Sequence, residues 1–367
     1  MKTVFNLEKV DATKQPMFFG EGLNMQRYDV FKYPVFDKLN ETMTSFFWRP
    51  QEVSLQKDRS DFALFRPEQK FIFTKNLASQ IVMDSIQGRS PTAVLMPYVS
   101  LPELEGCMNT WQYFEQIHSR SYTHILKNVY PNPAEVFDND VMDDQMIVDR
   151  AEVMSRYYDD FFNIANNYFI KGEGSLFNVK KKLVLAIYAA NALEGLRFYV
   201  SFACTFAFAE QKLVEGSAKI ISLIARDESQ HLSITQHIVK NWLRGDDPEI
   251  LEILNLVEVK QECLEIYLET VFGEKEWGKY LFSNGSIIGL NNRLTDLYVD
   301  YLAGRRMKAI GIEYPGPKVK ENPLPWTNHW LSSSSLQVAP QEAEIESYLV
   351  GAINPDINVE NLRGYVL

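Results

Sequence analysis

One apolar stretch sets the strongest limit on how this chain folds. Residues 183–209 read LVLAIYAANALEGLRFYVSFACTFAFA, which is long enough for a helix that spans a bilayer. Glu194 and Arg197 interrupt the stretch near its middle, and a mean hydropathy of −0.21 gives no sign of further spans to shelter them. A helix that is apolar on nearly all faces lies at the centre of a bundle or in a subunit interface. We therefore expect a buried core helix and no membrane association.

The rest of the chain shows a helical pattern almost throughout. Pro67 and Pro102 stand where a first helical turn accepts proline, and Gly88 follows a helix. No alternating strand pattern and no glycine-rich nucleotide motif is visible. The pattern predicts an all-α fold with long helices over residues 67–87, 102–129, 144–170, 180–210, 217–243, 248–272 and 290–311.

Charge and cysteine content argue against several classes of function. The chain has 37 basic and 48 acidic side chains, and a net charge of −11 disfavours nucleic acid as a partner. Cys107, Cys204 and Cys263 lie far apart and form no C-x-x-C pair, so neither a disulfide framework nor a cysteine-rich zinc site is expected. The first residues lack the apolar core of a signal peptide. These features together indicate a cytoplasmic protein.

Two Glu-x-x-His pairs carry the first chemical signal. They are Glu115 with His118 and Glu228 with His231. A spacing of three residues puts the carboxylate and the imidazole on one helical face, where both can reach the same metal ion. Carboxylate-bridged di-metal bundles combine two such pairs with one lone carboxylate from each of two other helices.

Two acids stand where those lone carboxylates would be expected. Asp84 and Glu194 each precede one of the pairs by about 30 residues, a spacing typical of successive long helices. Glu194 lies inside the apolar stretch, where a carboxylate must be paired or metal-bound. An ion pair with Arg197 is the alternative for Glu194. Four carboxylates and two imidazoles suit two iron or two manganese ions.

Aromatic and aliphatic residues accompany the candidate ligands. Tyr122 lies four residues beyond His118, on the same face, where a phenol could supply an electron to dioxygen reduction and become a radical. Phe198, Phe202 and Ile224 flank the metal-facing side and would keep water away from such a radical. Plain core residues are the alternative interpretation of all four.

The carboxyl-terminal part of the chain differs in composition. Residues 314–325 are proline-rich, and the stretch after Pro340 is acidic with few apolar repeats. We expect an amino-terminal arm over 1–30, a helical di-metal domain over 31–313, and a proline-rich segment with a flexible tail over 314–367. Apolar anchors remain at residues 348–350 and 365–367, which a partner could capture; simple disorder is the alternative.

At these residues the sequence resembles the small, radical-generating subunit of class Ia ribonucleotide reductase. The resemblance runs from Gln15 to the carboxyl terminus and implies a ferritin-like helical bundle with additional helices and an extended C-terminal tail. The motifs that carry it are SFFWRP at 45–50, DSIQGRSP at 84–91, IHSRSYTHI at 117–125, NALEGLRFYVSFAC at 191–204, LIARDE at 223–228 and ESYLVG at 346–351.

The resemblance also implies roles for individual residues. Asp84, Glu115 and His118 would hold one iron, and Glu194, Glu228 and His231 the other, with Glu115 and Glu228 bridging. The implied cofactor is an oxo-bridged pair of iron ions in each subunit, with a stable tyrosyl radical at Tyr122.

Three further residues receive roles in electron transfer from the resemblance. Trp48 would deliver the extra electron that cofactor assembly takes from an external donor, and would begin the radical route toward a partner. Asp227 would link Trp48 to the histidine ligand; a solvent-facing acid on its helix is the alternative. Tyr348 would relay the oxidising equivalent to the large subunit, onto which the last residues would dock; Tyr365 and Leu367 are the candidate anchors.

The implied activity is the reduction of ribonucleoside diphosphates to deoxyribonucleotides for DNA synthesis. The chain offers no dithiol, so substrate reduction must occur on the large catalytic subunit, which works with a homodimer of the small one. Three alternatives remain: an iron-storage protein, a di-iron oxygenase, and a dimanganese reductase subunit that a flavoprotein activates. The first two have no use for the tail, whereas ligands alone do not separate iron from manganese.

Overall fold

The structure of the chain, a computed structural model, describes residues 5–332. Within that range the regular secondary structure is helical, and β-type pairing is limited to isolated bridges between Phe18 and Val99 and between Ile287 and Leu290. The predicted all-α class is confirmed.

The helices follow one another with short connections. The long ones are α1 (Pro34–Ser45), α2 (Gln56–Leu64), α3 (Pro67–Gln87), α4 (Pro102–Val129), α6 (Gln145–Asn166), α7 (Leu176–Ala192), α8 (Tyr199–Ala209), α9 (Glu215–Leu243), α10 (Pro248–Asn255), α11 (Val257–Leu281) and α12 (Asn292–Ala309). Short helices are α5 (Pro133–Glu135) and α13 (Thr327–Leu331), and 3₁₀ turns are η1 (Ala12–Lys14), η2 (Pro50–Glu52) and η4 (Met96–Tyr98). Four π-helical segments complete the set: η3 (Ser90–Leu95), η5 (Val136–Val141), η6 (Asn167–Lys171) and η7 (Leu193–Arg197).

Local sequence explains where many of these helices begin. Proline occupies the first turn of α1, α3, α4 and α10, where its fixed φ suits the helix and its missing N–H is no loss. Asp247 also caps α10, because its side chain accepts hydrogen bonds from the backbone N–H groups of Glu249 and Ile250.

Each of the seven predicted helices has a counterpart, with three differences. The helix predicted over 144–170 ends in the π-helical η6 after α6. The helix predicted over 248–272 is divided into α10 and α11, because the backbone at Leu256 is extended. The helix predicted over 180–210 contains η7 between α7 and α8. Helices α1 and α2 were not predicted.

The apolar stretch forms the central helix of the molecule. Every residue from 183 to 209 is buried. The continuous helical segment Leu176–Ala209 is long and apolar enough to cross a membrane, but its apolar window lies wholly inside the bundle. The expectation of a buried core helix is confirmed.

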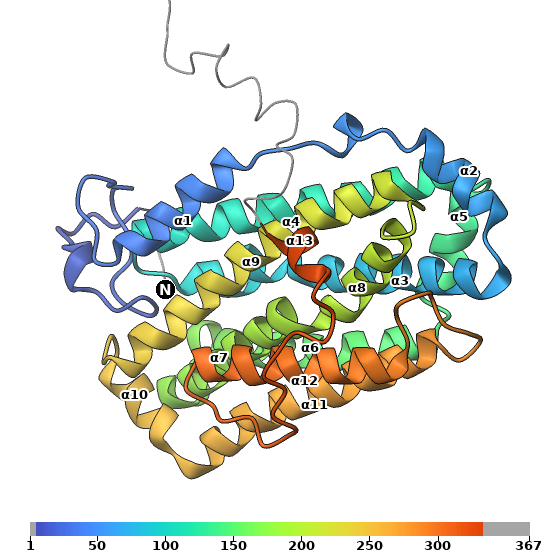
Figure 1. The fold of residues 1–367 in the computed structure, drawn as a ribbon. Helices are drawn as coiled ribbons and strands as arrows, with labels where there is room; N and C mark the ends of the chain where they lie inside the picture. Colours follow the sequence, from blue (N-terminus) through green and yellow to red (C-terminus); the bar gives the residue numbers. More distant parts are fainter. Residues whose placement is uncertain (1–4, 333–367) are drawn as a thin grey trace, which may run out of the picture.

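Four helices enclose the centre of the bundle. Helix α3 packs against α4 and α8, and α9 packs against α4, α7 and α8, so that the four form a closed ring. Helix α1 lies along α4 on one side, and α11 and α12 run together on the opposite side (Figure 1). Residues from four different stretches of the chain therefore face one interior.

The segment before α1 is hydrogen-bonded to the loop that follows the carboxyl end of α9. Asp246 accepts hydrogen bonds from the backbone N–H of Met17 at 2.8 Å, from Lys32 Nζ at 2.6 Å and from the Tyr33 hydroxyl at 2.8 Å. Met17 and Phe18 are buried against the bundle.

Candidate metal centre

The six candidate ligands come from α3, α4 and α9 of the enclosing ring and from η7, the segment directly before α8. Asp84 lies on α3, Glu115 and His118 on α4, Glu194 on η7, and Glu228 and His231 on α9. All six have 0% exposure. Because a carboxylate without a partner loses its solvation at such a place, this grouping requires cations or protons.

The six residues form two overlapping groups. One contains Asp84, Glu115, His118 and Glu228, and the other contains Glu115, Glu194, Glu228 and His231; in each, the ligand atoms lie within 4.8 Å of one another. Glu115 and Glu228 belong to both groups. This sharing is what a pair of ions bridged by two carboxylates requires, so the residues fit a dinuclear metal site.

Unpartnered atoms give an independent test of that fit. Every one of the six residues has at least one buried side-chain N or O atom without a hydrogen-bond partner among the described residues. These atoms are Asp84 Oδ1 and Oδ2, Glu115 Oε2, His118 Nδ1, Glu194 Oε2, Glu228 Oε1 and His231 Nε2. Buried polar atoms are nearly always satisfied, so a set concentrated at one place indicates a ligand there.

The electrostatics of the cluster also support a metal site. Burial raises the pKa of Asp84 well above its ordinary value, and repulsion from Glu115 and Glu228 raises it further. Burial and the same two carboxylates raise the pKa of Glu194. Burial alone would lower the pKa of His231, but hydrogen bonds and attraction to Glu115 and Glu228 raise it to about 9. Without cations the cluster therefore retains protons, which metal ions would replace.

A hydrogen-bonded chain leads away from His118. Asp227 Oδ2 lies 3.3 Å from His118 Nε2 and accepts a hydrogen bond of 2.8 Å from Trp48 Nε1. All three side chains are buried. The structure thus places Asp227 between the indole and the imidazole, rather than on the solvent-facing side of α9.

Tyr122 lies on α4 beside Asp84 and is fully buried. Burial raises the pKa of the Tyr122 phenol well above its ordinary value, and the negative charges of Asp84 and Glu228 add to the rise. The phenol is therefore neutral at physiological pH and holds its proton.

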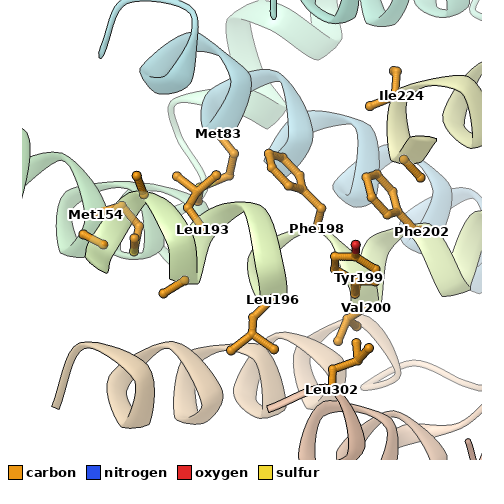
Figure 2. Packing of buried hydrophobic residues seen from close by; sticks show 14 of the residues in the cluster. Met83, Met154, Leu193, Leu196, Phe198, Tyr199, Val200, Phe202, Ile224 and Leu302 are labelled. Carbon is orange, nitrogen blue, oxygen red and sulfur yellow. The ribbon is translucent and has the colours of Figure 1, made fainter. Parts of the chain in front are cut away.

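Phe198, Phe202 and Ile224 are buried on one side of the segment formed by η7 and α8. Figure 2 shows both rings directed away from the face that carries Leu196 and Val200, with Phe202 on the side of Ile224. The rings of Phe198 and Phe202 are stacked, with centroids 5.7 Å apart. The three residues form a dry surface in the core.

The structure contradicts the alternative of an ion pair between Glu194 and Arg197. Arg197 Nη1 instead lies 3.8 Å from Glu274 Oε1, and Arg150 binds the same carboxylate oxygen. Glu194 accepts a hydrogen bond from Gln87. The two neighbours on η7 thus face different partners.

Two residues at the centre escaped the sequence analysis. Trp111 Nε1 donates a hydrogen bond of 3.0 Å to Glu115 Oε1, and Gln87 Nε2 donates to Glu194 Oε1. Trp111 lies one turn before Glu115 on α4, and this spacing was the available signal. Gln87 lies three residues after Asp84 but supports a ligand from another segment, which helical spacing could not indicate.

Other expectations concern cysteines and the tail. Cys107, Cys204 and Cys263 are all buried and free, and burial raises the pKa of each thiol above its ordinary value, so none is an accessible thiolate. Tyr348, Tyr365 and Leu367 lie outside the described residues.

Comparison with known proteins agrees with this geometry. The family model for the ribonucleotide reductase small chain matches residues 26–323. The chain is 48% identical to ribonucleoside-diphosphate reductase 1 subunit beta of Salmonella typhimurium, covering 100% of this chain and 99% of the relative. It is 47% identical to the corresponding beta subunit of Haemophilus influenzae, with the same coverage of both chains.

Solved structures agree as well. The ribonucleotide reductase R2 subunit from Clostridium botulinum superposes with a TM-score of 0.79 at 25% identity, covering 90% of this chain and 98% of the other. Its fold is a ferritin-like helical bundle, as the resemblance implied. The chain therefore belongs to the ribonucleotide reductase small-chain family, and it is the small subunit of an oxidoreductase that works together with a large subunit.

Proposed function

We propose that this subunit uses a pair of iron ions and dioxygen to generate a radical at Tyr122 and stores it for the large subunit. The observation that carries the proposal is the pair of overlapping ligand groups that share Glu115 and Glu228, with Tyr122 buried beside Asp84. The metal pair, when bound, would supply the oxidising power. The large subunit would use the stored equivalent to reduce ribonucleoside diphosphates to deoxyribonucleotides for DNA synthesis.

In this proposal the chain's own residues hold the metals, bridge them and exclude water. Asp84, Glu115 and His118 serve one ion, and Glu194, Glu228 and His231 the other, with Glu115 and Glu228 shared. Support comes from the unpartnered atoms at all six positions. Phe198, Phe202 and Ile224 provide a water-free wall, which a phenoxyl radical needs for a long lifetime.

Trp48 and Asp227 supply the route for the additional electron. Dioxygen reduction to the level of water takes four electrons, of which a bound pair of ferrous ions would supply two and Tyr122 would supply one. Trp48, linked to His118 through Asp227, would pass the fourth from an external donor. The same route would carry the equivalent outward, through Tyr348 in the tail, to the large subunit.

Iron is preferred to manganese because the motifs resemble the class Ia subunits. The donor set of carboxylates and imidazoles accepts either metal, so manganese is the alternative. We also propose a homodimer and a cytoplasmic location, which sedimentation analysis and cell fractionation would check.

A radical measurement tests the central proposal. Protein loaded with Fe(II) and exposed to oxygen should give a tyrosyl signal by electron paramagnetic resonance. Tyr122→Phe should bind two irons and lose the signal, because phenylalanine has no phenolic hydrogen to give. A wild-type protein that binds two irons without any radical signal would refute the radical role. Metal analysis of natively purified protein decides between iron and manganese.

The tail is tested separately. Tyr348→Phe should leave the Tyr122 radical intact and abolish turnover with the large subunit, because a phenylalanine is much harder to oxidise than a tyrosine. Retained turnover in this variant would exclude Tyr348 as a relay.

A further inference from the structure

Two buried side chains, Gln87 and Tyr158, form a hydrogen-bonded arm that ends on Glu194. Gln87, at the end of α3, donates from Nε2 to Glu194 Oε1, and the Tyr158 hydroxyl on α6 donates to Gln87 Oε1 at 2.6 Å. Gln87 and Glu194 have 0% exposure and Tyr158 has 3%. Three segments of the chain thus meet in one row of hydrogen bonds.

The hydrogen bonds of this row are donated in one direction, from Tyr158 toward Glu194. A phenol has one O–H to donate, and Tyr158 directs it at the amide oxygen of Gln87. The amide must then turn its NH₂ group toward Glu194. Glu194 consequently has one oxygen held by a donor, while Oε2 has no hydrogen-bond partner among the described residues.

Glu194 belongs to one of the two candidate metal positions. Glu194 offers an atom to the group that also contains Glu115, Glu228 and His231. We propose that Gln87 and Tyr158 are positioning residues for the second metal position: they hold Oε1 of Glu194 and thereby direct Oε2 to the ion. Neither residue contacts the reacting atoms.

The local backbone explains why Glu194 needs such support. Glu194 belongs to η7, whose π-helical turn is wider than that of an α-helix and less regularly bonded. The other five candidate ligands lie on α-helices. A side chain on the less regular segment benefits most from a partner on another helix.

Packing keeps the arm in place. Met83 and Met154 each lie four residues before one member of the arm, Gln87 and Tyr158 respectively, and so on the same helical face. Both methionines are buried members of the hydrophobic core that also contains Leu193, the residue before Glu194, and Figure 2 labels all three. Second-layer partners of metal ligands typically set metal affinity by 10- to 100-fold.

The chain contains a matched control for this arm. Tyr267 on α11 donates to Asn191 Oδ1, and Asn191 Nδ2 donates to Thr235 at 2.7 Å. This row has the same order of phenol, amide and acceptor and is equally buried. It ends on a hydroxyl rather than on a candidate ligand, so it should not affect metal binding.

Titration with Mn(II) alone tests the inference, which rests on the dinuclear site of the proposed function. Free Mn(II) is counted by electron paramagnetic resonance in wild type, Gln87→Met, Tyr158→Phe and Tyr267→Phe. Gln87→Met keeps the volume and loses the donor, so one of two binding steps should weaken by about 10- to 100-fold. Tyr158→Phe should weaken the same step by about 2- to 10-fold, the value of one hydrogen bond. Tyr267→Phe should bind as wild type does.

Each result has a distinct meaning. Unchanged binding by both Gln87→Met and Tyr158→Phe would overturn the positioning role while leaving the dinuclear site intact. An equal loss in Tyr267→Phe would also overturn it, because the effect would then be one of general packing. Wild-type protein that binds fewer than two Mn(II) ions would overturn the dinuclear site itself, and the inference with it. Tyr158→Phe removes one oxygen atom, so it keeps the test valid if Gln87→Met does not fold.

Discussion

At the scale of single residues, the orientation of His118 follows from its neighbours. The ring nitrogen Nε2 faces Asp227 at 3.3 Å, which favours a proton on Nε2, and Nδ1 faces the candidate ligands, 3.1 Å from Glu228 Oε1. Asp227 in turn is held by Trp48. One carboxylate thus favours one tautomer of a candidate ligand and joins it to an oxidisable indole.

Trp48→Phe tests that connection. The variant loses the N–H that binds Asp227 and has a side chain that is much harder to oxidise. We expect it to bind two metal ions and to form less of the Tyr122 radical, because the proposed route of the fourth electron is interrupted, while turnover per radical with the large subunit falls by about 100-fold. Turnover assays and electron paramagnetic resonance on the same sample measure both quantities.

The matched control is Trp277→Phe, because Trp277 is equally buried and donates to Ser201 at 2.9 Å, away from the candidate ligands. It should keep its turnover. A similar loss in both variants would assign the effect to general packing rather than to electron transfer.

Sequence reasoning worked well for residues whose signal is periodic. Glu115 and His118 share a helical face three residues apart, and any reader of the sequence can see that spacing. Gln87 and Tyr158 could not be found in this way, because their importance depends on which helices become neighbours. Arg197 was placed beside Glu194 as an alternative for the same reason: adjacency along the chain does not reveal the partner that α11 provides.

At the scale of the secondary-structure element, the limits were similar. Helix α2 reads QKDRSDFAL and has too few apolar positions to show a period, although it is held in place by Asp58, which binds the start of α9. The break between α10 and α11 has no proline or glycine at Leu256 to announce it. The extent of a long apolar helix can be predicted from the sequence. An interruption that packing between helices causes cannot.

Close packing between η7 and α11 gives a prediction at this scale. A Cβ added at Gly273 would overlap Arg197 Nη1 and lie 3.3 Å from its Cζ. Arg197 is buried beside Glu274 and has little room to move. Gly273→Ala should therefore lower the free energy of unfolding by about 1–3 kcal/mol, measured by urea denaturation.

Gly304→Ala is its control, because nothing lies within 4 Å of the added Cβ at that position of α12. Removing backbone freedom from a helix interior should raise the free energy of unfolding by roughly 0.5–1 kcal/mol. Equal stability of the two variants would show that Arg197 adjusts without cost.

At the scale of the whole molecule, the centre joins four segments that are far apart along the chain. Asp84 and His231 are at its two ends in sequence, yet both contribute to one buried cluster. The bundle around them must contain four carboxylates whose mutual repulsion opposes folding unless cations or protons intervene.

Metal removal should therefore weaken the whole fold. Ions that bind the native state at about 100 times their dissociation constant add about 2.7 kcal/mol each. We expect the melting temperature of metal-loaded protein to exceed that of chelated protein by roughly 5 °C in scanning calorimetry. Tyr122→Phe retains all six candidate ligands and should show the same difference. Equal melting temperatures with and without metal would indicate that the cluster is not a metal site.

The π-helical segment η7 has a consequence for how this chain can vary. Its wider turn accommodates one residue more than an α-helix would, so deleting a single residue between 193 and 197 would restore regular helical bonding. The same deletion would rotate α7 relative to α8 by about 100°, because each residue turns a helix by that angle. Since every residue from 183 to 209 is buried, one of the two helices would then present the wrong side to its neighbours. The number of residues in this turn is therefore constrained as well as the identity of Glu194 within it.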